Sequence, residues 1–109
     1  MSKITTHLLD TVLGEPAAGV AVRLERLVGD RWSTVSESAT DADGRCRDLA
    51  QDATTGFYRL SFDTAEYFLR SDRLGIYPKI SITFACDGET NYHLPLLLSD
   101  NSYTTYRWS

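Results

Sequence analysis

The chain has 109 residues, 42% of them apolar, and a formal net charge of −4 at pH 7. This length is that of one domain, residues 1–109, and the apolar content is enough for a core, which argues against disorder. The sequence has no basic stripe of the kind that binds nucleic acid, and its longest apolar cluster, residues 94–98, is far too short to cross a membrane.

The first half of the chain has the alternating pattern of β-strands. Residues 4–9 alternate threonine with bulkier side chains, and residues 20–27 place Val20, Val22 and Leu24 on one face with Arg23 and Glu25 on the other. This period of two predicts strands that are buried on one face. Residues 29–30 (Gly-Asp) predict a turn into a strand at 31–38, and the Asp- and Gly-rich residues 40–45 predict a second turn.

The second half continues in the same way. Residues 56–62 form an aromatic, strand-like run, and residues 79–85 alternate Ile and Phe with polar side chains. Asp87-Gly88 predicts a hairpin turn into a strand at 90–98, and a last strand is predicted at 102–108.

One helix is predicted within residues 62–72. Asp63 is a favourable N-cap with a glutamate three residues later, which is close to a capping box. The two turns that follow are expected to bury Ala65, Phe68 and Leu69. Short strands with turn signals between them, together with this one short helix, predict a mainly β protein, an antiparallel β-sandwich.

Aromatic and sulfur-containing side chains give further expectations. Trp32, Tyr58 and Phe84 are expected in the core. The N-terminal segment has no apolar stretch of the signal-peptide kind, which predicts a cytoplasmic protein. Cys46 and Cys86 are then expected to be reduced, small apolar side chains.

Few residues are candidates for chemistry on sequence alone. His7 and His93 are the two histidines, and a lone histidine in a strand is more often structural than catalytic. The chain has no His-x-His pair and no Cys-x-x-Cys motif, so a zinc site is not expected. Arg45 closes the 40–45 turn, where a solvated arginine without a function is as good an interpretation as a functional one. Ser109 is terminal, and most terminal serines have no functional role.

Four short motifs, in this order and spacing, carry a resemblance. They are THLLDT (6–11), TDADGR (40–45), HLPLLLS (93–99) and YTTYRWS (103–109). Together they resemble the 5-hydroxyisourate hydrolases, the enzyme branch of the transthyretin-like family, and the resemblance covers nearly the whole chain. It implies a transthyretin-like β-sandwich.

The resemblance also implies which residues form the site. The catalytic set carried over to this chain is His7, Arg45, His93 and Ser109. The substrate-binding pair carried over is Tyr106 and Arg107. These residue types suit the chemistry, because imidazole can act as a base near neutral pH and a nearby arginine disfavours its protonated form. Which histidine is the base stays open at this point.

The implied reaction is the hydrolysis of 5-hydroxyisourate to 2-oxo-4-hydroxy-4-carboxy-5-ureidoimidazoline in urate (purine) degradation. The resemblance implies no cofactor and no metal. The implied partners are the small-molecule substrate and further copies of the chain, in a homotetramer built as a dimer of dimers. Each active site is then expected at an interface between dimers.

One position departs from the family, and alternatives follow. The family ends in Tyr-Arg-Gly-Ser, whereas this chain has Trp108 in place of the glycine. In one reading, strand alternation lets Trp108 pack away from the substrate or against the neighbouring subunit. In the other, Trp108 displaces Ser109, blocks the channel or loosens the tetramer, which impairs or alters the hydrolase. A non-catalytic, transthyretin-like small-molecule binder and a plain β-sandwich interaction module are the other readings.

Overall fold

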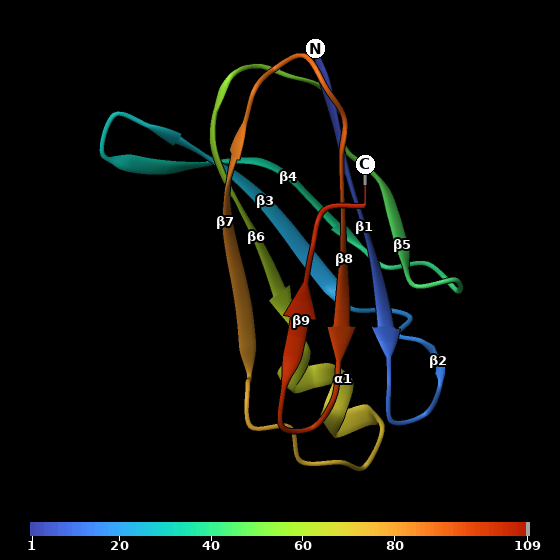
Figure 1. The fold of residues 1–109 in the computed structure, drawn as a ribbon. Helices are drawn as coiled ribbons and strands as arrows, with labels where there is room; N and C mark the ends of the chain where they lie inside the picture. The colour runs from blue at the N-terminus through green and yellow to red at the C-terminus, as the bar shows by residue number, and fades with distance from the viewer. Residues whose placement is uncertain (109) are drawn as a thin grey trace.

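The computed structural model describes residues 1–108, and Ser109 lies outside the described residues. Within residues 1–108, two β-sheets pack face to face and one short helix, α1, lies at one end of the sandwich (Figure 1). The predicted β-sandwich with one short helix is therefore confirmed. No helix in this part of the chain has the length and apolar character needed to cross a membrane.

The first sheet contains both ends of the described chain. Its strands are β1 (Ser2–Asp10), β2 (Glu15–Pro16), β5 (Arg45–Ala53), β8 (Tyr92–Leu98) and β9 (Tyr103–Thr105). β8 lies between β1 and β9, and β2 and β5 both pair with β1. Among the described strands, β1 and β8 form the one parallel pair in the otherwise antiparallel sandwich. Because no short turn connects these two strands, local sequence does not constrain their relative direction.

The second sheet is antiparallel throughout. Its strands are β3 (Ala21–Val28), β4 (Arg31–Ala39), β6 (Gly56–Asp63) and β7 (Lys79–Cys86), in the order β4-β3-β6-β7. β3 and β4 form the predicted hairpin. Its turn contains Gly29 at φ 65°, a left-handed conformation that glycine adopts without steric cost.

The core lies between the two sheets and is built from alternate strand positions. The fully buried side chains that meet there include Ile4, Leu8, Leu24, Leu60, Phe62, Ile80, Leu96 and Leu98. Burial of one such side chain contributes about 1.5–3 kcal/mol. Tyr58 is buried as predicted, whereas Trp32 and Phe84 are only partly buried.

The structure differs from the prediction at the 87–88 turn and at the end of the last strand. The carboxylate of Asp87 accepts hydrogen bonds from the N–H groups of Glu89 and Thr90, which forms a tight turn. This turn carries the chain from β7 in one sheet to β8 in the other, so the predicted hairpin is wrong. The last strand, predicted at 102–108, ends at Thr105 because the chain then leaves the β8 ladder.

The helix α1 (Thr64–Arg70) follows the predicted segment but buries a different stripe. Asp63 occupies the N-cap position, although its side chain makes no capping hydrogen bond. Tyr67 and Phe68 are buried with Thr64, one turn apart on the same face. Leu69 falls outside that stripe and is 76% exposed, so its predicted burial is wrong.

An ion-pair network fastens the end of β1 to the β8–β9 turn. The Arg73 guanidinium, which follows α1, binds both Asp10 at the end of β1 and Asp100 in the turn. The Tyr67 hydroxyl donates to Asp10 Oδ2 at 2.6 Å. Burial raises the pKa of Asp10, but the hydrogen bonds from Arg73 and Tyr67 outweigh it and hold that pKa below its usual value.

Candidate active site

Three neighbouring strands bring the predicted catalytic side chains together. In the β1–β5 register His7 lies opposite Arg45, and in the β1–β8 register Thr5 lies opposite His93. The even-numbered positions of β1 are buried, so Thr5 and His7 project from the outer face of the sheet. The site therefore lies on the outside of the sandwich and not in its core.

A cavity of about 460 Å³ marks this place on the sheet. Its lining residues are His7, Leu9, Arg45, His93, Pro95, Tyr106 and Trp108. The volume falls within the range of about 300–1,000 Å³ that is usual for small-molecule sites. The described residues that line it include two imidazoles and a guanidinium but no acid, so the cavity favours a ligand that is anionic or rich in carbonyl oxygens.

The 40–45 turn holds His7 in a defined orientation. Nε2 of His7 lies 2.9 Å from the carbonyl oxygen of Asp43. Because a carbonyl oxygen only accepts, Nε2 carries the proton, and Nδ1 of neutral His7 keeps its lone pair.

The same turn positions Arg45 at the cavity wall. The Asp41 carboxylate accepts the backbone N–H groups of both Asp43 and Arg45. Gly44 has φ 77°, and a Cβ there would lie 2.4 Å from the carbonyl oxygen of Leu8, so the turn packs directly against β1. Within residues 1–108, no carboxylate pairs with the Arg45 guanidinium, which leaves its donors available to a ligand.

His93 is held by a threonine and has a lowered pKa. Its Nδ1 lies 2.8 Å from Oγ1 of Thr5. Partial burial, and then the positive charge of Arg45 and the neighbouring His7, lower the pKa of His93 below its usual value. The neutral form of the imidazole is therefore favoured. Thr5 was not among the sequence-predicted residues, because its partnership with His93 depends on the parallel register of β1 and β8.

Arg107 does not line the cavity. Its guanidinium donates to Oγ1 of Thr90 at 2.8 Å and to the carbonyl oxygen of Asn91 at 2.9 Å. It also lies over the ring of Tyr92, 4.1 Å from the ring centroid. Tyr106, predicted as its substrate-binding partner, does line the cavity. The two neighbours in the chain thus point to different sides, and Arg107 fastens the C-terminal segment to the β7–β8 connection.

Trp108 lines the cavity beside Tyr106 and does not pack away from it as one sequence interpretation held. Its backbone N–H donates to the carbonyl oxygen of His93 at 2.8 Å. Its indole meets the Tyr106 ring edge to face, with centroids 6.5 Å apart. The predicted catalytic residue Ser109 lies outside the described residues.

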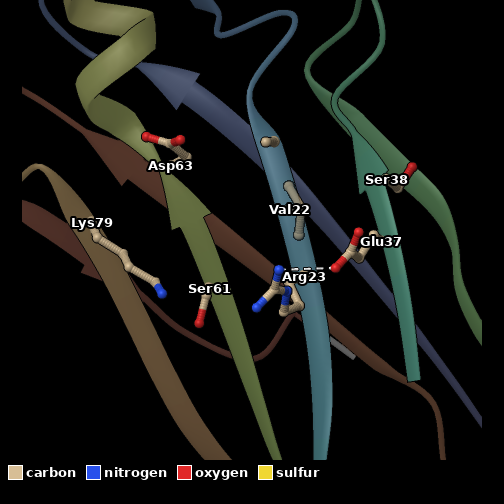
Figure 2. Close-up of a pocket in the computed structure, with 8 residues that line it drawn as sticks. Val22, Arg23, Glu37, Ser38, Ser61, Asp63 and Lys79 are labelled. Carbon is tan, nitrogen blue, oxygen red and sulfur yellow. Dashed lines mark ion pairs between the residues drawn. The ribbon is translucent and has the colours of Figure 1, made fainter. Parts of the chain in front are cut away.

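A second cavity, of about 370 Å³, lies on the other sheet and is a weaker candidate. Figure 2 shows Ser61 of β6 between Lys79 of β7 and Arg23 of β3. Arg23 is already paired with Glu37 at 2.9 Å, and Asp63 lies opposite Lys79 in the register. Its charges therefore balance, and none of its described lining residues is a histidine or cysteine, so it lacks a group that titrates near neutral pH.

The chain is a β-sandwich with two histidines and an arginine in one cavity of its outer face, and no carboxylate within residues 1–108 pairs with that arginine. These features define the class of proteins that act on or bind small polar molecules. The model of the HIUase/Transthyretin family matches residues 4–108. The chain therefore belongs to the HIUase/Transthyretin family.

Similar proteins include both branches of this family. The 5-hydroxyisourate hydrolase of Mus musculus is 42% identical over 113 residues, covering 99% of this chain and 96% of that protein. The structure of Klebsiella pneumoniae 5-hydroxyisourate hydrolase has a TM-score of 0.89 at 35% identity and covers 100% of both chains. The sea bream transthyretin solved with thyroxine has a TM-score of 0.91 at 31% identity, covering 95% of this chain and 92% of that one.

The fold does not separate the two branches, since a 5-hydroxyisourate hydrolase and a transthyretin solved with thyroxine match it about equally well. The side chains of the site are what can separate them. A non-catalytic binder has no need of two imidazoles and a guanidinium in one cavity, whereas a hydrolase uses both kinds of group.

Proposed function

We propose that this protein is a 5-hydroxyisourate hydrolase of urate degradation, which opens a ring amide with water. The observation that carries the proposal is the cavity in which His7, Arg45 and His93 meet. The 42% identity to the mouse 5-hydroxyisourate hydrolase over almost the whole chain supports it. Hydrolysis of an amide transfers no electrons, so the reaction needs no redox cofactor.

His93 is the general base in this proposal. Its lowered pKa keeps the imidazole neutral, and its Nδ1 is occupied by Thr5. When Nδ1–H donates to Oγ1 of Thr5, Nε2 keeps the lone pair that removes a proton from water. The oxygen of that water then adds to the ring carbonyl carbon of the substrate.

Arg45 stabilises the charge that develops on the carbonyl oxygen. Its planar donors suit an oxygen anion, and no carboxylate among the described residues competes for them. The ring C–N bond then breaks and its electron pair passes to the nitrogen, which takes the proton held by His93. The single product is the ring-opened compound 2-oxo-4-hydroxy-4-carboxy-5-ureidoimidazoline, which carries both the new carboxyl group and the ureido group.

The remaining predicted residues complete the site in this proposal. His7 orients the substrate or the water through Nδ1, because its Nε2 is held by Asp43. Tyr106 contributes a hydroxyl and a ring to the cavity wall. Ser109, at the end of the same segment, joins the catalytic set as a further hydrogen-bonding group for the water.

The test is the ultraviolet decay of freshly generated 5-hydroxyisourate, with its spontaneous decay as the baseline. The wild-type chain is expected to accelerate this decay, and His7→Asn, Arg45→Met and His93→Asn are expected to lose most of the acceleration. Arg31→Ala, an exposed residue of β4, is the control. If the wild type gave no acceleration, the non-catalytic binder would replace this proposal. Full turnover in both histidine variants would remove the catalytic assignment.

We also propose that the protein is a homotetramer, a dimer of dimers, with each site at an interface between dimers. Support comes from the position of the cavity on an outer sheet face, where Leu9 and Pro95 add apolar surface beside the polar groups. Apolar surface of this kind commonly marks an interface. Light scattering coupled to size-exclusion chromatography gives the subunit number. A monomer would contradict the proposal and favour a simple interaction module.

The cytoplasm is the location that we propose. Cys46 and Cys86 are both free and buried, which suits a reducing compartment. Burial raises the pKa of the Cys46 thiol to about 11, so it is unreactive at neutral pH. Fractionation of cells that produce the protein would test this location, and recovery outside the cytoplasm would contradict it.

A further inference from the structure

We propose that Trp108 is a specificity-determining residue, which with Tyr106 forms an aromatic wall for the flat face of a conjugated heterocyclic ligand. The inference rests on the proposed function for the identity of the substrate, a purine-derived ring system. It does not rest on catalysis, because it concerns binding alone.

The first support is the uncovered aromatic surface beside the polar groups. Trp108 is 71% exposed and Tyr106 is 43% exposed, and both line the cavity that holds the histidines and Arg45. The two rings meet at an interplanar angle of 73°, so they are not stacked on each other and leave ring surface available to a ligand.

The second support is that this wall has a fixed position. The backbone N–H of Trp108 is bonded to the carbonyl oxygen of His93, the residue whose side chain enters the same cavity. One position earlier, Arg107 is fastened to Thr90, Asn91 and the ring of Tyr92. A segment held at two consecutive residues loses little further freedom when a ligand binds.

The third support is the division of chemistry within the cavity. His7, Arg45 and His93 offer hydrogen bonds, which suit the carbonyl and N–H groups on the edges of a ring. An aromatic wall offers dispersion and stacking, which suit the face of the ring. A ligand with both features is a flat, polar heterocycle, whereas an open-chain polar molecule would use the edge groups alone.

Binding of urate, a stable flat purine, tests the wall without any need for turnover. Isothermal titration calorimetry on the intact protein measures the affinity, and tryptophan fluorescence reports on the position of the ligand. Trp108→Gly is expected to weaken urate binding about tenfold, in line with the loss of one stacking contact, while Trp108→Phe stays within about threefold of the wild type.

Trp32 provides the fluorescence control. It lies on β4, in the other sheet, where its ring is covered by the Arg59 guanidinium 4.4 Å from the ring centroid. Urate is therefore expected to quench the fluorescence of Trp32→Phe, which retains Trp108, and to leave that of Trp108→Phe nearly unchanged.

The possible outcomes separate this inference from the proposed function. Equal urate affinity in Trp108→Gly and the wild type would overturn the inference. So would a change in subunit number in Trp108→Gly, because Trp108 would then be covered by a second copy of the chain. If urate binding depended on Trp108 but 5-hydroxyisourate decayed at its spontaneous rate, the hydrolase proposal would fail and the aromatic wall would stand.

Discussion

Oγ1 of Thr5 lies 2.8 Å from Nδ1 of His93, although 88 positions separate the two residues in the chain. The parallel register of β1 and β8 places them directly opposite each other on the outer face of the sheet. Among the hydrogen bonds of the described residues, this is the one that holds the His93 ring, so Thr5 acts as a positioning residue for the proposed base.

Replacement of Thr5 by valine keeps the shape of the side chain and removes the hydroxyl. We expect kcat for 5-hydroxyisourate to fall about tenfold while KM changes little, because the base is misoriented and not lost. Thr34→Val, an exposed threonine in the other sheet, is the matched control. An unchanged kcat in Thr5→Val would show that the Thr5 contact does not orient the catalytic ring.

Arg45 should affect the pH profile as well as the rate. Burial is the larger cause of the lowered pKa of His93, and the charge of Arg45 is the next. A base acts in its neutral form, so activity is lost as the pH falls through its pKa. Arg45→Met removes a positive charge, so the pKa of His93 rises and the acidic limb of kcat/KM moves to higher pH.

The same variant should also lose rate at every pH. Removal of a group that stabilises an oxygen anion costs about 10²–10³ in kcat. Arg47→Met, on the same strand but exposed and paired with Asp41, is the control and should keep both the rate and the acidic limb. An acidic limb that stayed in place in Arg45→Met would contradict the proposed role of His93 as the base.

The residues that carry motifs could be found from the sequence, but the contacts that position them could not. His7, Arg45 and His93 stand in recognisable motifs, and the structure places them in one cavity. Thr5 has no local signal, since its role depends on a parallel pairing across 88 positions. Trp108 stood out as a departure from the family, but the direction of its side chain is set by the His93 carbonyl that holds its backbone.

Strand β5 was not among the predicted strands, and its burial pattern explains why. Its buried positions are Cys46, Leu49 and Ala53, which do not follow a period of two. The register between β1 and β5 shifts twice, so bulges break the alternation that would indicate a strand. Leu69 is the opposite case, a residue predicted to be buried that is exposed. In a short helix with apolar side chains on several sides, the sequence does not reveal which of them will face the core.

Arg107 provides a test of the C-terminal segment. We expect Arg107→Gln to lower kcat/KM about tenfold, because Tyr106 and Trp108 lose their fixed position over the cavity. Arg107→Lys should not restore it, since an ammonium lacks the planar guanidinium that lies over the Tyr92 ring while its Nη2 donates to Thr90 and Asn91.

A double-mutant cycle with Thr90→Val distinguishes a clamp from a substrate contact. If Arg107 acts through Thr90, the double variant should be little worse than Arg107→Gln alone. Additive losses in kcat/KM would instead indicate that Arg107 contacts the substrate directly, as the family resemblance implied.

The Asp10–Arg73 pair should contribute most of the electrostatic stability where the end of β1 meets the β8–β9 turn. The Asp10 side chain is fully buried and that of Arg73 is 15% exposed, and Arg73 also binds Asp100. Arg73→Met leaves a buried carboxylate without its partner, which costs about 3–5 kcal/mol in the free energy of unfolding. Arg23→Met breaks the exposed pair with Glu37 and should cost less than about 1 kcal/mol. Urea unfolding at one protein concentration compares the variants, and similar losses would contradict this assignment.

The stability gap between Arg73→Met and the wild type should depend on pH. In the wild type the pKa of Asp10 is lowered, so its contribution is fully present above the usual aspartate pKa and is lost as the pH falls through the lowered value. In the variant, burial without Arg73 raises that pKa, so Asp10 takes up a proton on folding as the pH falls and the penalty of a buried charge decreases. The gap should therefore narrow from pH 7 towards about pH 4. A gap that stayed constant over this range would show that the loss in Arg73→Met comes from packing and not from the Asp10 charge.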